Sequence, residues 1–205
     1  MTQLASPWRA FHRANALTYA SLCAAIAAIG CAAAGRAAGA GACVAIAVIA
    51  DTFDGRFARI FKRSAVQRAI GVQLDSLSDA IAFGIAPVVC AALLTAGPDH
   101  WTPMLLTFWW TSAAAYAACA ITRLAFYNLM HEDSAGFVGL PVPVAALVWA
   151  TALLLAPGPA VSIALFATTA AAMVLPLPIP RPTGFGLAAF ACWPMVVVAL
   201  NVVRG

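Results

Sequence analysis

Residues 51–79 read DTFDGRFARIFKRSAVQRAIGVQLDSLSD and separate two long apolar stretches of the chain. This segment is 29 residues long, yet it holds nine of the chain's 18 charged residues (11 basic and 7 acidic). Over all 205 residues, 64% are hydrophobic and 9% are charged, whereas roughly a quarter of the residues in soluble domains are charged. The composition therefore excludes a soluble enzyme, a disordered chain and a secreted disulfide scaffold, and it predicts an integral membrane protein.

Apolar stretches on both sides of this segment are long enough to cross a hydrocarbon core about 30 Å thick. They give seven candidate spans, near residues 15–34, 37–57, 72–97, 104–127, 139–157, 159–176 and 185–203. Prolines interrupt the last third, so we expect six spans and leave the seventh open. The expected fold is all-α, a polytopic transmembrane helix bundle over residues 14–205, preceded by a short interfacial helix over residues 1–13.

The basic residues indicate how the bundle is oriented. If the spans alternate, two basic residues, Arg36 and Arg204, fall on one side of the membrane. The other nine fall on the opposite side: Arg9, Arg13, Arg56, Arg59, Lys62, Arg63, Arg68, Arg123 and Arg181. Because cytoplasmic loops carry the excess of Lys and Arg, this second side is expected to be cytoplasmic. Basic residues scattered through loops, without a continuous tract, argue against a nucleic-acid partner.

Four aspartates within the quoted segment form two pairs at helical spacing. Asp51 and Asp54 are three residues apart, and Asp75 and Asp79 are four apart, so each pair shares one helix face. The basic stretch between the pairs suits a turn at the membrane surface. Two antiparallel helices joined by that turn would bring all four carboxylates into one cluster. The face of the first pair also carries Gly55, Ala58 and Arg59.

Such a cluster needs compensation, because close carboxylates repel one another strongly at low dielectric. A hard divalent cation prefers oxygen ligands of this kind, and two such ions in one site commonly handle phosphoryl groups. Gly55 and Ala58 remove side-chain bulk beside the cluster, and Arg59 offers a planar fork for a pyrophosphate. Interhelical salt bridges are the structural alternative, but they would need neither small residue, and carboxylates within a membrane are usually functional.

The aspartates belong to a longer pattern. It reads D-x-x-D-G-x-x-A-R, then eleven further residues, then G-x-x-x-D-x-x-x-D. This pattern resembles the signature of the CDP-alcohol phosphatidyltransferase family. The resemblance implies a six-helix core in which an alcohol attacks the lipid-linked phosphate of CDP-diacylglycerol and CMP leaves. It also implies two divalent ions, Mg²⁺ or Mn²⁺, and a homodimer. By this resemblance the metal ligands are Asp51, Asp54, Asp75 and Asp79, and Asp79 is also the base toward the alcohol. The CDP pocket would be lined by Gly55, Ala58, Arg59 and Gly71.

Further stretches resemble the bacterial and archaeal phosphatidylserine synthases of this family. They are LDSLSDAIAFGIAP (74–87), RLAFYN (123–128), GLPVPVAA (139–146) and the pair Asn15 and Thr18. This likeness implies serine as the acceptor and a prokaryotic plasma membrane, with acceptor or lipid-phosphate contacts from Arg123, Asn128, Asn15 and Thr18. The chain departs from the pattern at Phe126, where these synthases carry a second arginine, and at Ala82 and Ala14. Inositol phosphate, glycerol phosphate and choline therefore stay open as acceptors.

Two of these residues also have purely structural interpretations. Arg123 would serve equally well as a side chain that reaches the headgroups from the end of its span. Asn128 would serve as a helix cap. Two other classes of function remain for the whole chain. One is a divalent cation transporter, which leaves Gly55 and Ala58 unexplained, and the other is a non-catalytic scaffold, which leaves four intact aspartates unexplained.

Overall fold

The computed structural model describes residues 8, 11–95, 101–130, 137–176, 178–179 and 185–204. Within these residues the structure is helical except for one short strand pair, which confirms the expected all-α fold. The helices are α1 (Ala16–Ala33), α2 (Ala37–Ala58), α3 (Ala65–Asp79), α4 (Ala86–Leu94), α5 (Pro103–Met130), α6 (Val142–Leu153), α7 (Pro159–Val174) and α8 (Phe185–Arg204). Strand β1 (Phe137–Val138) pairs antiparallel with β2 (Pro178–Ile179). The expected interfacial helix over residues 1–13 lies almost entirely outside the described residues.

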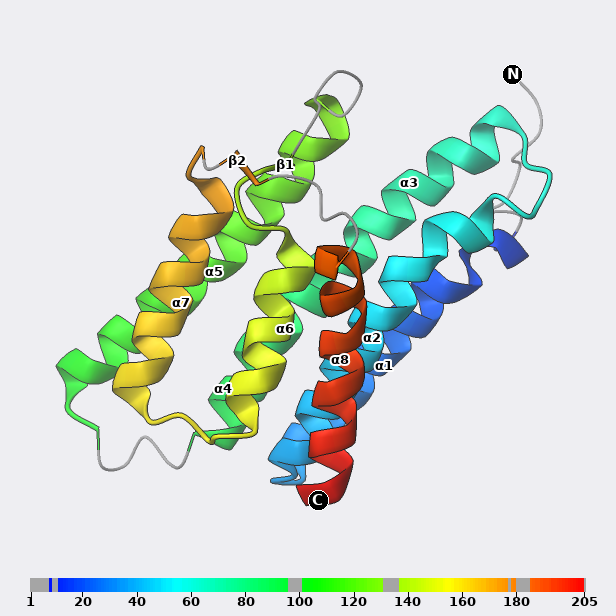
Figure 1. The fold of residues 1–205 in the computed structure, drawn as a ribbon. Coiled ribbons are helices and arrows are strands. Elements are labelled where there is room, and N and C mark those ends of the chain that lie inside the picture. Colours follow the sequence, from blue (N-terminus) through cyan, green and yellow to red (C-terminus); the bar gives the residue numbers. More distant parts are fainter. Residues whose placement is uncertain are drawn as a thin grey trace.

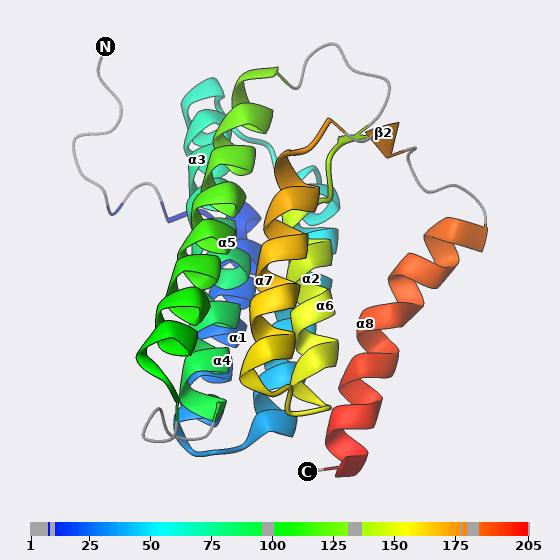
Figure 2. The same ribbon diagram turned by 90° about the vertical axis from the view of Figure 1, so that its left-hand side faces the viewer.

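The helices form an elongated bundle in which most of the main packing partners are not neighbours in the sequence (Figures 1 and 2). Helix α1 packs on α2, α5 packs on α7, and α6 and α8 both contact α2. Helix α3 extends beyond the bundle beside the end of α2, at the upper right of Figure 1. The turn between α2 and α3 therefore marks one end of the molecule, while Arg36 and the C-terminus of α8 lie at the other end.

Four helical stretches are long and apolar enough to cross a membrane: Arg13–Ala33, Ala37–Ala58, Ala65–Leu94 and Pro103–Leu129. Three shorter apolar helical stretches follow, Val142–Leu153, Pro159–Val174 and Cys192–Val203. The order of apolar helices thus agrees with the expected spans. The third differs most, because its helix begins at Ala65, seven residues before the apolar stretch expected from residue 72.

A capping box explains that early start. The side chain of Ser64 accepts a hydrogen bond from the backbone N–H of Gln67, and the Gln67 side chain accepts one from the Ser64 N–H. These two bonds satisfy N–H groups that a helix start leaves without partners. The first turns of α3 are therefore helical although they are polar, and they project past the apolar part of the bundle.

The third stretch widens into a π-helical segment over Ala80–Ile85, directly after Asp79. Segments of this kind are rare, and they are found frequently at functional sites. The hydroxyl of Tyr116 on α5 donates a 2.8 Å hydrogen bond to the carbonyl of Phe83 within it. Because lipid offers no alternative partner, this bond fixes the segment that follows Asp79 against α5.

A buried aromatic cluster holds the other half of the bundle together. Phe166 on α7 stacks on Trp149 of α6 with ring centres 4.0 Å apart, and it meets the rings of Trp109 and Tyr116 on α5 at 5.5 Å. All four side chains are almost completely buried. Because small alanines surround these rings, the helices approach closely. Helices α5 and α6, held by this cluster, pack against the π-helical segment.

Candidate active site

The four aspartates of the quoted segment meet between α2 and α3. Asp51, Asp54 and Asp75 each direct a carboxylate oxygen to a common point, with these oxygens all within 4.8 Å of one another. Asp79 completes the group, since its carboxyl group and that of Asp51 are close enough to share a hydrogen bond. It is the most buried of the four, at 9% exposure. The antiparallel arrangement expected from the spacing thus places both pairs in one cluster.

Helix α1 supports this cluster from a third side. The hydroxyl of Thr18 donates a 3.1 Å hydrogen bond to Asp54 Oδ2. The hydroxyl of Ser78, next to Asp79 in the sequence, donates one of 3.1 Å to the Thr18 carbonyl. Both Thr18 and Ser78 are buried. One residue of α1 therefore connects to both aspartate-bearing helices, which limits how far the two pairs of carboxylates can separate.

A pocket of about 240 Å³ opens beside the cluster. It is lined by Ala14, Asn15, Thr18, Asp54, Gly55, Ala58, Arg59, Arg63, Gly71, Val72 and Asp75. All four residues expected to bind CDP are among them, together with Asn15 and Thr18. A side chain at Gly55 would meet nothing within 4 Å, so the missing Cβ leaves space in the pocket itself.

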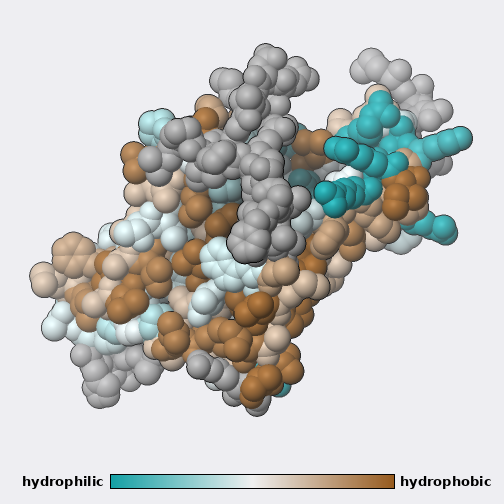
Figure 3. All heavy atoms as spheres, viewed as in Figure 1, coloured by the Kyte–Doolittle hydropathy of each residue, from teal (hydrophilic) through white to brown (hydrophobic). Residues whose placement is uncertain are grey.

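Hydrophilic side chains gather on the surface around this end of the molecule, at the upper right of Figure 3, while apolar residues dominate the remaining coloured surface. Exposed Arg56, Arg59, Lys62 and Arg68 belong to this end. The pocket itself is lined by two carboxylates, Asp54 and Asp75, and by two basic residues, Arg59 and Arg63. That distribution suits a ligand that carries phosphate groups and approaches from the polar side of the membrane.

The donor set of the cluster fits a hard divalent cation. It consists of carboxylate oxygens alone, which Mg²⁺ and Mn²⁺ prefer over nitrogen or sulfur donors. Asp75 Oδ1 is buried without a hydrogen-bond partner, and a buried polar atom left in this way is costly. A cation bound among Asp51, Asp54 and Asp75 would provide that missing partner.

Arg123 is not among the residues that line the aspartate pocket; it lines a separate pocket of about 300 Å³. Its side chain is buried at 7% exposure, and its Nη2 donates to the carbonyls of Val138 at 3.2 Å and Gly139 at 2.9 Å. The guanidinium also lies over the ring of Tyr127, 4.4 Å from its centre. Gly139 has φ +72°, which only glycine adopts without strain. Arg123 thus joins two of the quoted stretches, RLAFYN and GLPVPVAA, by anchoring a turn.

Asn128 is not a helix cap, because α5 continues past it to Met130. Its Nδ2 donates a 2.7 Å hydrogen bond to Ser76 Oγ on α3. Ser76 directly follows Asp75, so this bond connects α5 to the helix that carries the second aspartate pair. The structure therefore separates the four residues suggested for the acceptor: Asn15 and Thr18 line the pocket, while Arg123 and Asn128 make contacts between elements.

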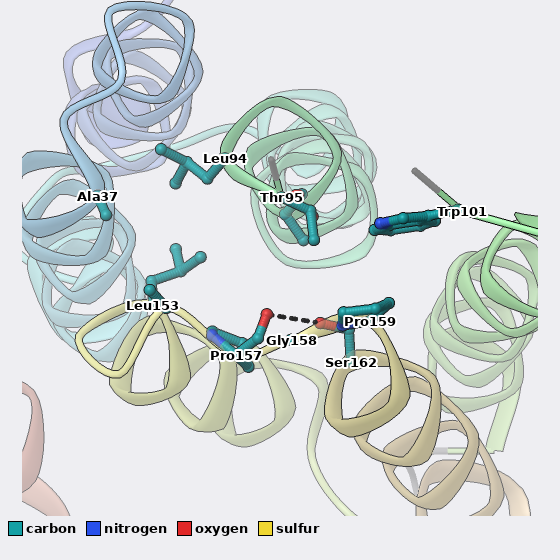
Figure 4. Close-up of a pocket in the computed structure, with 11 residues that line it drawn as sticks. Ala37, Leu94, Thr95, Trp101, Leu153, Pro157, Gly158, Pro159 and Ser162 are labelled. Carbon is teal, nitrogen blue, oxygen red and sulfur yellow. Dashed lines mark hydrogen bonds between the residues drawn. The ribbon is translucent and has the colours of Figure 1, made fainter. Parts of the chain in front are cut away.

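A larger cavity of about 370 Å³ lies at the opposite end of the bundle. Figure 4 shows its lining between the end of α4, the start of α2 and the turn from α6 to α7. Its labelled side chains are apolar apart from Thr95 and Ser162, and the Ser162 hydroxyl already donates to the Pro157 carbonyl. This lining carries no acid, base or metal ligand, so the aspartate pocket is the candidate active site.

Comparison with known proteins agrees with this choice. The family model of CDP-alcohol phosphatidyltransferases matches residues 11–178, which include the whole pocket. The chain belongs to the CDP-alcohol phosphatidyltransferase family. The match ends before α8, so the family core comprises α1 to α7 with β1 and the start of β2.

Three relatives of the chain are named for products that contain serine or for serine as the acceptor. CDP-diacylglycerol–serine O-phosphatidyltransferase of Mycobacterium tuberculosis is 36% identical over 142 residues, which cover 65% of this chain and 46% of that protein. Archaetidylserine synthase of Methanothermobacter thermautotrophicus is 34% identical over 102 residues, covering 50% of this chain and 40% of that protein. The CDP-diacylglycerol–serine O-phosphatidyltransferase of Saccharomyces cerevisiae is 34% identical over 118 residues, covering 53% of this chain and 39% of that protein. The matched part thus spans less than half the length of these relatives.

Three features around the site could not be predicted from the sequence. Arg63 lines the pocket although it lies outside the signature, and the sequence offered only its place in a basic turn. The π-helical segment after Asp79 was also missed, because its residues AIAFGI are ordinary helix formers apart from Gly84. Asn128 and Ser76 carry no pairing signal, since 52 residues separate them.

Proposed function

We propose that the chain transfers a phosphatidyl group from CDP-diacylglycerol to the hydroxyl of serine and releases CMP. The observation that carries this proposal is the convergence of the Asp51, Asp54 and Asp75 carboxylates at a pocket lined by small residues. Family membership supports the reaction class. The names of the relatives support serine, and inositol phosphate, glycerol phosphate and choline remain the alternatives.

In the proposed reaction, the serine hydroxyl oxygen forms a bond to the phosphorus that carries diacylglycerol. The bond between this phosphorus and the oxygen shared with CMP breaks, and CMP leaves with that oxygen. Asp79 accepts the hydroxyl proton as the general base. Its position supports this role, because it is the most buried of the four aspartates and lies one helical turn from Asp75.

Asp51, Asp54 and Asp75, with Asp79 at the edge of the cluster, would hold two divalent ions, Mg²⁺ or Mn²⁺. Bound there, the ions would neutralise the pyrophosphate and stabilise the charge that develops on departing CMP. The chain's own residues would place the substrate against this site. Gly55, Ala58, Arg59 and Gly71 form the proposed CDP-binding wall, and Arg59 supplies donors for phosphate oxygens.

Asn15 and Thr18 remain proposed contacts within the pocket, since both line it. We assign Arg123 and Asn128 to positioning roles, because their side chains bond to Val138, Gly139 and Ser76. Arg123 would hold the turn before α6. Asn128 would hold α3 in place next to Asp75, through its bond to Ser76. The residues that recognise the serine carboxylate are then expected at the pocket, not at Arg123.

We further propose that the site faces the cytoplasm from a prokaryotic plasma membrane. The exposed basic residues around the α2–α3 turn support this orientation, because positive charge is retained on the cytoplasmic side. Arg36, which precedes α2, lies at the end of the bundle remote from the cluster and supports the same proposal. A homodimer is proposed from the family resemblance, and mass measurement of the protein in detergent tests it.

The proposed function is tested with protein purified in detergent. CDP-diacylglycerol, Mg²⁺ and labelled serine should yield labelled lipid and one CMP per product, and Asp79→Asn should remove both signals. CMP release with another alcohol, in place of serine, would keep the reaction class and overturn the acceptor. Metal flux into liposomes without CDP-lipid, with no CMP release for any alcohol, would instead favour the cation transporter.

A further inference from the structure

Arg63 occupies a wall of the aspartate pocket that the family signature does not define. It lies between Arg59 and Gly71 in the sequence and lines the same pocket as both. Its guanidinium approaches Gly71 so closely that a Cβ on Gly71 would lie 3.3 Å from Arg63 Nη1. The same Cβ would lie 3.3 Å from Asn15 Oδ1. Arg63 and Asn15 therefore fill the space that the missing side chain leaves.

The two glycines of the pocket consequently have different roles. A Cβ at Gly55 would enter open space, whereas one at Gly71 would press on Arg63 and Asn15. Gly55 thus leaves room for a ligand directly. Gly71 leaves room for a guanidinium, and that guanidinium then faces the ligand space. A Cβ at position 71 would therefore require the guanidinium of Arg63 and the amide of Asn15 to shift by a few tenths of an ångström.

The backbone around Arg63 is held in place by its neighbours. The Nη1 of Arg68 donates a 2.8 Å hydrogen bond to the Arg63 carbonyl. Ser64 and Gln67 close the capping box directly after it. A basic side chain on a free turn would usually be solvated and mobile, but these three bonds fix the turn at the start of α3. The Arg63 side chain is therefore directed along α3 toward Gly71.

The position of Arg63 along the pocket indicates which part of the substrate it meets. Asp75 lies four residues after Gly71, about 6 Å further along α3. If the aspartates hold the metal-bound diphosphate, the nucleoside of CDP-lipid extends from there toward Gly71 and the polar surface. Arg63 offers N–H donors, and Asn15 adds an amide that both donates and accepts. A cytosine edge, with two acceptors and one amino donor, matches this pair.

We propose that Arg63 binds the cytidine end of the CDP-lipid and that Gly71 is needed to accommodate its guanidinium. This inference rests on the proposed function and deepens it at one residue. It predicts that nucleotide binding depends on Arg63 and that substitutions at positions 63 and 71 are coupled. The coupling follows because residues that contact one another give non-additive effects.

The test measures CMP binding calorimetrically with Mg²⁺ present, alongside KM for CDP-diacylglycerol. Arg63→Ala should weaken CMP binding and raise KM by about 10- to 100-fold, the loss expected for hydrogen bonds from a charged group. Inhibition by inorganic pyrophosphate should change by less than about threefold, because the diphosphate lies at the aspartates. The exposed Arg56 at the same end of the molecule provides the matched control, and Arg56→Ala should leave CMP binding unchanged.

The coupling is tested in a double-mutant cycle. Gly71→Ala alone should weaken CMP binding, and in the Arg63→Ala background its penalty should shrink by about threefold or more. Equal penalties in both backgrounds would overturn the role given to Gly71. An unchanged CMP affinity in Arg63→Ala, or an equal loss of pyrophosphate inhibition, would overturn the cytidine contact while leaving the proposed function intact. If the wild-type protein does not bind CMP, both the cytidine contact and the proposed function are overturned. Thermal unfolding of each variant in detergent identifies any that fail to fold.

Discussion

Thr18 on α1 and Asp54 on α2 are joined by a 3.1 Å hydrogen bond between the threonine hydroxyl and carboxylate Oδ2. The backbone carbonyl of Thr18 in turn accepts from Ser78 on α3. A residue of the first span therefore holds both helices of the aspartate cluster.

Replacing Thr18 by Val keeps the shape of the side chain but removes the donor to Asp54. We expect kcat/KM for CDP-diacylglycerol to fall about tenfold, because hydrogen bonds to charged groups contribute about 1.5–3 kcal/mol. Thr18→Ser retains the hydroxyl and should keep most of the activity. CMP release assays on both variants test this expectation. Equal activity of Thr18→Val and the wild type would show that the bond does not position Asp54.

If divalent cations bind the aspartate cluster as proposed, they should stabilise the folded protein by relieving the repulsion among its carboxylates. At a concentration of Mg²⁺ 100 times its dissociation constant, the gain is about 2.7 kcal/mol. Thermal unfolding in detergent, with and without chelator, measures this effect. Asp75→Asn should abolish the response to Mg²⁺. A response of equal size in that variant would place the cation elsewhere.

Asp79→Asn should separate proton transfer from substrate binding. The amide cannot accept the hydroxyl proton of the proposed serine acceptor, so kcat should fall by about 10²–10⁴, the usual contribution of general acid–base catalysis. CMP binding should fall far less, since Asp51, Asp54 and Asp75 remain. Calorimetry of CMP binding and single-turnover assays distinguish the two effects. Retained turnover would assign the base to another group.

Arg123→Met tests whether this residue positions a turn or binds the acceptor. Its removal leaves the carbonyls of Val138 and Gly139 without their donor, so unfolding should require about 1–3 kcal/mol less free energy. The KM for serine, measured below the unfolding transition, should stay within about twofold of the wild type. Arg36→Met, at the other end of the bundle, serves as the control for loss of an arginine. A large rise in the KM for serine without loss of stability would indicate that Arg123 contacts the acceptor.

Much of the site was predictable because helical spacing is a local property. Asp51 and Asp54, or Asp75 and Asp79, share a face in any regular helix, and the basic turn between the pairs leaves an antiparallel arrangement as the simple solution. The early start of α3 was harder to predict. The capping box at Ser64 begins the helix in polar residues, and a search for apolar stretches does not detect them. The partners of Arg123 and Asn128 were not predictable for a different reason, and the acceptor contacts expected of them remain predictions. Both side chains carry N–H donors that would suit a ligand. Only the tertiary structure shows which groups of the protein accept their hydrogen bonds.

The sequence by itself determined that this chain lies in a membrane, that its spans are helical, and that four aspartates form one cluster. These features depend on composition and on spacing within single helices or across one turn. Only the tertiary structure decided that Thr18 reaches Asp54, that Arg123 anchors Gly139, and that Arg63 fills the space beside Gly71. Each of these contacts joins segments whose approach depends on how helices pack, and the packing of alanine-rich helices is governed by shape across the bundle, which no local pattern encodes.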